Sequence, residues 1–293
     1  MSLTAFALIL LAGLIHASWN IVAKKVGGDA RFAFFTSVLM MLFWAPLGWW
    51  MGRHVVPLWG VREWALIGVS GVLHVLYFVI LLRGYRQADL TVVYPLARGS
   101  GPLLSSLAAI VLLGEQVTAL GGLGIAGVVG GVFLIAGGPG LLRAAHNPVA
   151  RARVHQGIAY GLLTGVFIAS YTVVDGYAVK VVLISPILID YMGNLVRVAL
   201  LAPTVLRDLS TAAVLWRAQW RPALLVGAVS PVAYVLVLYA MQQAPLSHVA
   251  PAREVSMLFA ALIGGHLLGE GDRVARLLGA LCIAAGVTAL ALG

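Results

Sequence analysis

The 293-residue chain has little charge and almost no cysteine. Asp, Glu, Lys and Arg make up only 10% of its residues, whereas 61% are hydrophobic and the mean hydropathy is +1.01. Soluble domains carry about 25% charged residues, so this composition excludes a soluble enzyme or a soluble nucleic-acid-binding protein. The single cysteine, Cys282, excludes an intrachain disulfide and a thiolate metal cluster. The composition therefore predicts an integral membrane protein.

The sequence also lacks the motifs of common hydrolases and metalloenzymes. It contains no His-Glu-x-x-His run, no aspartate pair at metal spacing and no nucleophile elbow. We therefore predict no catalytic residue, no metal and no cofactor. The net charge of +9 is expected from basic loops beside an anionic membrane surface, not from contact with nucleic acid.

Breaks in the apolar pattern divide the chain into ten segments. A spanning helix needs about 20 apolar residues to cross about 30 Å of hydrocarbon. A barrel strand would alternate polar and apolar residues, whereas the run 103–113 is apolar on nearly every face. We predict an all-α integral membrane fold of ten transmembrane helices with cores at 3–23, 33–51, 63–82, 90–113, 117–137, 157–178, 183–206, 221–241, 246–268 and 274–292.

The basic residues are distributed unevenly between the two sets of loops. Loops on the side of the N-terminus carry three, namely Arg53, Arg62 and Lys180. The opposite loops carry Lys24, Lys25, Arg31, Arg83, Arg86, Arg143, Arg151, Arg153, Arg207, Arg217, Arg221, Arg273 and Arg276. By the positive-inside rule, we expect a multi-pass protein of the inner (plasma) membrane with both termini outside.

The two halves of the sequence are related. Leu112-Leu113-Gly114-Glu115 recurs 155 residues later as Leu267-Leu268-Gly269-Glu270, and the same offset pairs Arg98, Gly124, Gly131 and Val132 with Arg253, Gly279, Gly286 and Val287. Five helices per half is an odd number, so the repeats are expected to insert in opposite orientations around a central cavity. We predict a first repeat at 1–137, a basic cytoplasmic connector at 138–156 and a second repeat at 157–293.

Polar residues inside the predicted helices are candidates for a binding site. A charge at the bilayer centre costs about 2.5–3.5 kcal/mol even on the lenient insertion scale, so its presence calls for a function or a partner. Pairing among Arg98, Arg253 and Glu254 is the structural alternative. We predict a substrate site formed by His16, Trp19, Asn20, His74, Tyr77, Tyr94, Arg98, Tyr171, Asp175, Tyr234, Arg253 and Glu254.

Two prolines and two acids at matching positions add further expectations. Pro95 and Pro251 each remove a helical hydrogen bond and are predicted to break their helices beside the central site; an inherited packing kink is the alternative. Glu115 and Glu270 are predicted to be first-turn acids of the helices that follow them. Small residues at 127, 131, 282 and 286 allow two helices, or two copies of the chain, to approach closely, so both a monomer and a homodimer stay open.

These features together resemble the EamA-type drug/metabolite transporter superfamily. The resemblance rests on the ten-helix duplicated pattern, the paired Leu-Leu-Gly-Glu segments, the stretch Ala17-Ser18-Trp19-Asn20 and the two prolines. It is greatest with bacterial exporters of amino acids, including aromatic ones. It implies a basket-like bundle whose central cavity recruits the site residues named above other than Asp175 and Arg253, and the role of the Arg253-Glu254 pair rests on its charge alone.

The resulting hypothesis is a secondary transporter that exports aromatic or neutral amino acids by alternating access. Aromatic rings would hold the side chain, Arg98 or Arg253 the carboxylate, and Glu254 or Asp175 the ammonium. The partners would be this substrate, the lipid bilayer and protons carried by His16, His74 or Glu254. The alternatives are a multidrug or other metabolite efflux pump of the same fold and a membrane-embedded enzyme.

Overall fold

The computed structural model describes residues 1–88, 90–136, 151–260 and 273–293 and is helical throughout, with no strand in those ranges. The first half contains α1 (Leu3–Val26), α2 (Ala30–Gly52), the short 3-10 helix η1 (Val56–Leu58), α3 (Val61–Gln87), α4 (Leu90–Leu113) and α5 (Ala119–Ile135). The second half contains α7 (Arg151–Lys180), α8 (Pro186–Leu206), α9 (Leu209–Gln243), α10 (Leu246–Ala252) and α12 (Arg273–Leu292).

Most helices coincide with the predicted segments, and the differences lie at their ends. Helix α7 begins at Arg151, inside the predicted connector, and α9 begins at Leu209, well before the predicted residue 221. Both extensions lack an early proline or glycine, so nothing interrupts the helix where the apolar pattern fades. Residues 261–268 of the ninth predicted segment lie outside the described residues.

Polar caps define several helix starts. The Asp29 carboxylate accepts hydrogen bonds from the backbone N–H groups of Arg31 and Phe32, at 2.9 and 3.3 Å, and so begins α2. The Thr118 hydroxyl accepts from Gly121 N–H at 3.0 Å and begins α5. At α9, hydrogen bonds from Thr211 lower the pKa of Asp208 to about 2, because they stabilise its charged form.

Seven of the described helices are long and apolar enough to cross a membrane. They are α1, α2, α3, α4, α7, α8 and α9, and the shorter helices α5 and α12 are also apolar. Many large apolar side chains on these helices point outward, including Leu42, Phe43, Val111 and Leu123, which are more than half exposed. In water this surface would be costly, whereas hydrocarbon solvates it. The chain is therefore a multi-pass membrane protein.

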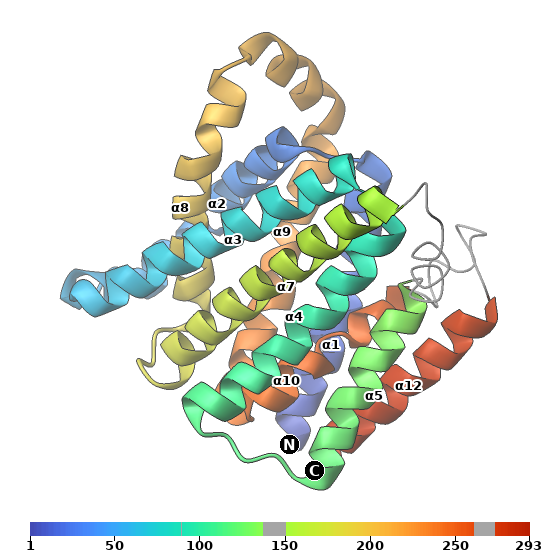
Figure 1. Cartoon of the computed structure of the whole chain (residues 1–293). Helices are drawn as coiled ribbons and strands as arrows, with labels where there is room; N and C mark the ends of the chain where they lie inside the picture. The colour runs from blue at the N-terminus through green and yellow to red at the C-terminus, as the bar shows by residue number, and fades with distance from the viewer. Residues whose placement is uncertain (89, 137–150, 261–272) are drawn as a thin grey trace.

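Helices α5 and α12 pack against each other with their backbones almost touching. A Cβ atom added to Gly124 would lie 2.9 Å from the carbonyl oxygen of Gly286, and one added to Gly131 would lie 2.5 Å from that of Gly279. Only glycine permits this approach. The residue order of the two contacts also shows that the helices run antiparallel, as the adjacent α5 and α12 ribbons in Figure 1 do.

Several of the remaining contacts form matching pairs. The counterparts in the two halves are α1 and α7, α2 and α8, α3 and α9, α4 and α10, and α5 and α12. Exchanging counterparts turns the α1–α9 contact into α7–α3 and the α2–α9 contact into α8–α3, and all four contacts occur. Helices α2 and α8, and α4 and α10, contact their own counterparts. Close approaches follow the same rule, since Gly13 meets Ser256 and its counterpart Gly165 meets Ser100.

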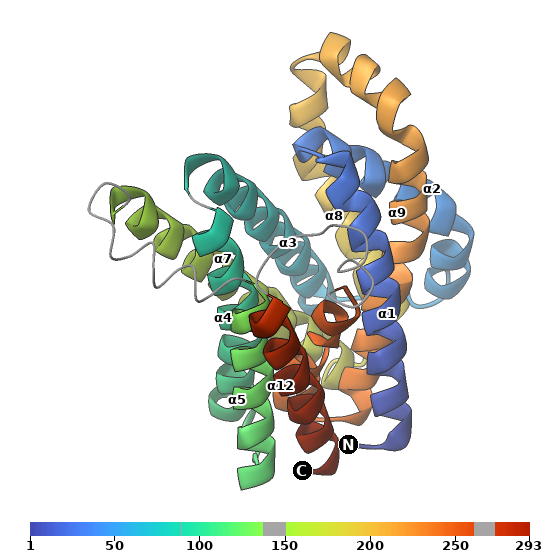
Figure 2. The same ribbon diagram turned by 90° about the vertical axis from the view of Figure 1, so that its right-hand side faces the viewer.

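Both chain termini lie at one end of the bundle (Figure 1), and the Met1 ammonium donates a hydrogen bond to the Ala291 carbonyl oxygen at 2.8 Å. Toward the opposite end, the ribbons of α3 and α7 diverge from those of α1 and α9 (Figure 2). The main buried core, which includes Ile9, Ile67, Leu238 and Ile283, draws on both halves of the chain.

The two prolines behave differently. Helix α4 runs without interruption from Leu90 to Leu113 with Pro95 inside it, so the structure does not contain the break expected there. Pro95 lies near the start of its helix, where a missing N–H removes only one hydrogen bond from a long ladder. After Pro251, in contrast, α10 ends at Ala252, and the chain turns at Arg253 and Glu254 before residues 255–260 resume a helix.

Candidate functional site

Three charges, one buried carboxylate and two partly buried guanidinium groups, meet where α4 approaches the end of α10. Arg98 Nη2 lies 3.0 Å from Glu254 Oε2, and Arg253 Nε lies 3.6 Å from Glu254 Oε1. The Glu254 side chain is only 3% exposed, so its charge requires these partners. Two guanidinium groups against one carboxylate leave one positive charge in excess, which favours an anionic group as a further partner.

The helix interruption after Pro251 presents two of these charges. Glu254 N–H donates to Pro251 O at 2.9 Å and Met257 N–H donates to Glu254 O at 2.8 Å, so three-residue hydrogen bonds replace the α-helical pattern here. The turn allows successive residues, Arg253 and Glu254, to take part in one cluster. The predicted break at Pro251 therefore coincides with the charged group, and the ion pairing considered as the structural alternative is present.

Aromatic rings from three helices surround the next part of the site. His74 on α3 stacks on Tyr171 of α7 with ring centroids 4.0 Å apart, and Tyr234 of α9 meets the edge of His74 at 5.6 Å. Tyr77, one turn from His74, lies 5.7 Å from Tyr171. The Arg253 guanidinium carbon is 5.9 Å from the Tyr171 ring centroid, so Tyr171 joins the aromatic group to the charged one.

Asp175 lies one helical turn beyond Tyr171 on α7 and is 1% exposed. One of its oxygens, Oδ2, accepts a hydrogen bond from the Tyr234 hydroxyl and lies 4.0 Å from His74 Nε2. The other oxygen, Oδ1, is buried without a hydrogen-bond partner. His74 is oriented by its other ring nitrogen, Nδ1, which is 2.8 Å from the Ser70 carbonyl oxygen.

The residues predicted on α1 and α4 are less tightly joined to this group. His16 and Trp19 meet edge to face at 4.8 Å, and the Trp19 indole N–H is buried without a hydrogen-bond partner. The Asn20 side chain donates to the His16 carbonyl oxygen of its own helix at 2.9 Å. Tyr94 packs against the main core one turn before Arg98. The charges of Arg98 and Arg253 act on the His16 ring.

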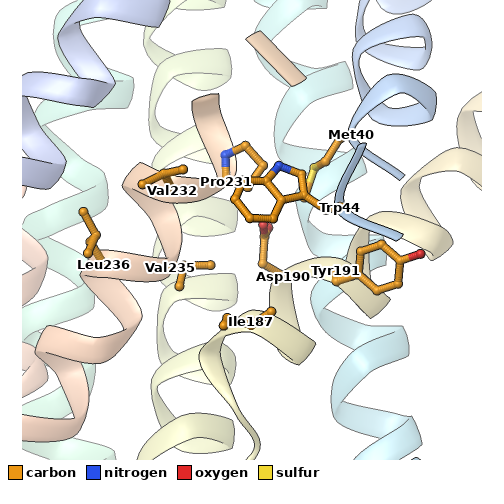
Figure 3. Close-up of a pocket in the computed structure, with 9 residues that line it drawn as sticks. All are labelled: Met40, Trp44, Ile187, Asp190, Tyr191, Pro231, Val232, Val235 and Leu236. Atoms are coloured by element: carbon orange, nitrogen blue, oxygen red, sulfur yellow. The ribbon is translucent and has the colours of Figure 1, made fainter. Parts of the chain in front are cut away.

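A second charged pair lies on α8, beside a mostly apolar pocket. Arg197 Nη2 donates to Asp190 Oδ1 at 2.9 Å, and Asn194 on the same helix donates to the Ser37 carbonyl oxygen at 2.9 Å. Figure 3 shows Asp190 and Trp44 together in a cavity of about 210 Å³ between α2, α8 and α9. The Asp190 carboxylate is already paired with Arg197, so this pocket offers a ligand mainly apolar side chains.

The sequence analysis assigned Glu115 to the first turn of the helix that follows it. That prediction is wrong, because Thr118 caps α5. The two oxygens of Glu115 instead accept hydrogen bonds from Leu246 and Ser247 N–H, each at 2.8 Å, at the start of α10. Lys180 lies 3.1 Å away. Burial alone would raise the pKa of Glu115, but these donors outweigh it and lower the pKa. Glu270 lies outside the described residues.

The Glu115 hydrogen bonds belong to a group of polar contacts that joins the end of α9 and the start of α10 to the ends of α4 and α7. Ser106 Oγ donates to the Ser247 carbonyl oxygen at 2.8 Å, and the Gln242 amide donates to the Val179 carbonyl oxygen at 3.1 Å. These contacts join residues 63 to 141 positions apart along the chain, so no local sequence signal could have revealed them. Ser70, in contrast, could have been found from its four-residue spacing to His74.

The fold and the charged cluster define a class of protein, a multi-pass helical membrane protein with polar groups buried between its helices. The chain belongs to the EamA-like transporter family, whose profile matches residues 3–137 and 155–292. This family lies in the drug/metabolite transporter superfamily, and its members transport small molecules and are not enzymes. A solved crystal structure with 16% sequence identity covers 98% of both chains at a TM-score of 0.74, which shows the same fold. No curated protein matches the chain.

Proposed function

We propose that this transporter exports amino acids with aromatic or neutral side chains across the inner membrane. The observation that carries the proposal is the cluster of Arg98, Arg253 and Glu254, which keeps one positive charge in excess beside the rings of Tyr171 and Tyr234. A substrate carboxylate would accept hydrogen bonds from the arginines. Its side chain would pack against the aromatic rings.

The proposed transport cycle is alternating access between two inverted five-helix repeats. The exchange of helix contacts between the halves, and the antiparallel glycine contact of α5 with α12, support a twofold relation in the membrane plane. The positive-inside rule supports a cytoplasmic position for the end that carries Arg31, Arg207 and Arg217. The opposite end of the bundle, which holds both chain termini and the Glu115 contacts, would then face outward.

Counterflow of labelled amino acids into proteoliposomes tests this proposal. With equal pH on both sides, we expect saturable exchange of phenylalanine and other neutral amino acids above that of empty liposomes. Arg98→Ala should raise KM for amino acids about 10–100-fold, because a hydrogen bond to a charged group contributes about 1.5–3 kcal/mol. The matched control is Arg197→Ala, which removes the partly buried arginine of the α8 pair.

Other outcomes would redirect the assignment. If no amino acid exchanges and lipophilic cations do, the protein is a multidrug efflux pump. The excess positive charge of the cluster argues against that candidate, because it repels cationic drugs. If Arg98→Ala and Glu254→Gln both leave the flux unchanged, the charged cluster is not the substrate site.

A further inference from the structure

Asp175 differs from the other buried carboxylates that the structure describes. Glu254 lies beside two arginines and Asp190 lies beside Arg197. Asp175 has neither a lysine nor an arginine as a partner within the described residues, although it is 1% exposed. An ionised carboxylate in such surroundings is costly unless a cation comes to it. The site therefore needs a removable positive charge.

The groups around Asp175 leave one of its oxygens without a hydrogen-bond partner. The Asp175 Oδ2 atom is engaged by the Tyr234 hydroxyl, but Oδ1 has no hydrogen-bond partner. His74 Nε2 is 4.0 Å from Oδ2, which is beyond direct hydrogen-bond distance, so a proton would pass between the two groups through one water. The carboxylate thus has both a free acceptor oxygen and a titratable neighbour.

The other charged and titratable groups around α7 do not replace this cation. From α8, the Asp190–Arg197 pair acts on Asp175 with charges of opposite sign. From α4 and the end of α10, Arg98 and Arg253 are paired with Glu254, and Arg253 acts on His74 and Tyr234. On α7 itself, Tyr171 lies one turn away. The charge of Asp175 is therefore left for a mobile ion.

The position of Asp175 relates this ion to the substrate. The residue is one helical turn from Tyr171, and the Arg253 guanidinium lies over the Tyr171 ring. An α-amino acid carries its ammonium on the carbon next to its carboxylate, so a substrate bound at Arg253 would place its ammonium near the face of α7 that holds Tyr171 and Asp175. The proton and the ammonium would then need the same negative charge.

We propose that Asp175 is a proton-binding site whose proton is displaced by the substrate ammonium, which makes the transporter a proton/amino-acid antiporter. This inference rests on the proposed function. One proton leaves the Asp175 carboxyl, by way of His74 or water, for each amino acid that binds. The same carboxylate takes up a proton after the amino acid has left.

Proton release on binding tests the proposal without a variant. Phenylalanine is added to the purified wild-type protein in weakly buffered detergent solution, and the released protons and bound amino acid are both counted. We expect a release that approaches one proton per molecule bound at acidic pH, and affinity that falls up to about tenfold per pH unit as the solution is acidified, from simple competition. Phenylpropionate, which lacks the ammonium, should release none.

Variants assign the proton to its residue. Asp175→Asn should bind phenylalanine more weakly, with no proton release and no pH dependence, whereas Asp175→Glu should restore both. Glu63→Gln is the control, since its exposed carboxylate accepts only from Gly60 N–H at the start of α3, and its proton release should equal that of the wild type. In proteoliposomes, an imposed pH gradient should drive accumulation by the wild-type protein but not by Asp175→Asn.

Each contrary result has a separate meaning. Wild-type exchange of phenylalanine with pH-independent binding overturns the proton site and leaves the proposed function intact. Absence of exchange for every amino acid overturns both. Proton release that persists in Asp175→Asn moves the proton to another group, and release with phenylpropionate shows that the ammonium is not the competing charge.

Discussion

Glu115 is expected to keep closed the end of the bundle at which both chain termini lie, and its removal should open that end. The residue follows α4, yet its carboxylate accepts from the first N–H groups of α10 and pairs with Lys180 at the end of α7. Glu115→Ala removes all three contacts. Glu115→Gln keeps one acceptor oxygen but loses the charge.

The magnitude follows from the donors left behind. Leu246 and Ser247 are 0% exposed, so their N–H groups cannot turn to water in the closed form. An unsatisfied buried donor costs about 1–3 kcal/mol, and two of them give about 2–6 kcal/mol for Glu115→Ala. For Glu115→Gln, with one donor still satisfied, we expect about 1–2 kcal/mol. At 1.4 kcal/mol per decade, these values correspond to an open fraction raised about 30-fold or more for Glu115→Ala and about 5–30-fold for Glu115→Gln.

Cysteine labelling measures this opening. Cys282 is the only cysteine in the chain, so Cys282→Ala provides a background free of thiols. Ser247→Cys is then a mild probe, because the Ser247 hydroxyl is buried without a hydrogen-bond partner. The rate of reaction with a membrane-impermeant maleimide should rise in the order wild type, Glu115→Gln, Glu115→Ala.

Glu63 supplies the control. Its carboxylate accepts a hydrogen bond from the backbone N–H of Gly60, three residues earlier, at 2.8 Å, and so serves only its own helix. Glu63→Ala should leave the labelling rate of the probe unchanged. If Glu115→Ala, properly folded, reacts no faster than the wild type, the Glu115 contacts do not hold the closed form and the reasoning is refuted.

Three further predictions follow from the same contacts. Gly131→Ala should lower stability in thermal unfolding by about 1–3 kcal/mol, because its Cβ would meet the Gly279 carbonyl oxygen at 2.5 Å. The Cβ of the control Gly130→Ala meets nothing within 4 Å, so that variant should be neutral or stabilising. Equal effects of the two substitutions would contradict this packing. Glu254→Gln should lower stability by about 3–5 kcal/mol, since it leaves two arginines without their carboxylate, and an unchanged unfolding temperature would show that water already solvates them. Because the folded-state pKa of Glu115 is lowered from 4.5, its contribution is complete above pH 4.5 and is lost as pH falls through the folded-state value. The thiolate of the probe also becomes scarcer as pH falls, so its labelling rate is divided by that of the Glu115→Gln protein at the same pH, and this ratio should rise below pH 4.5.

The helices could be predicted from sequence because membrane insertion is a local requirement. A run such as 90–113 must be apolar along its own length, and α4 has these bounds in the structure. Buried charges were recognisable for the same reason, since Arg98 and Glu254 are conspicuous in an apolar run. Their pairing could be offered only as an alternative, because it depends on how two distant helices pack.

Contacts between helices carry no comparable signal. Asp175 and Tyr234 were each predicted as site residues, but nothing in the spacing within α7 or α9 indicates that they share a hydrogen bond. Glu115 was assigned to the nearest helix because local capping is the common case, whereas its donors are 131 and 132 residues away. The continuous helix at Pro95 illustrates the same point, since matching residues in the two halves did not require matching backbones.

The glycine contact between α5 and α12 restricts how the two halves can diverge. In most interfaces, a larger residue on one side can be accommodated by a smaller one on the other. Here Gly124 faces the backbone of Gly286, and Gly131 faces that of Gly279, so no smaller residue exists to compensate for a substitution. Each copy must therefore retain its own glycines independently, and specialisation of the duplicated gene is directed to the other helices, where side chains can still be exchanged.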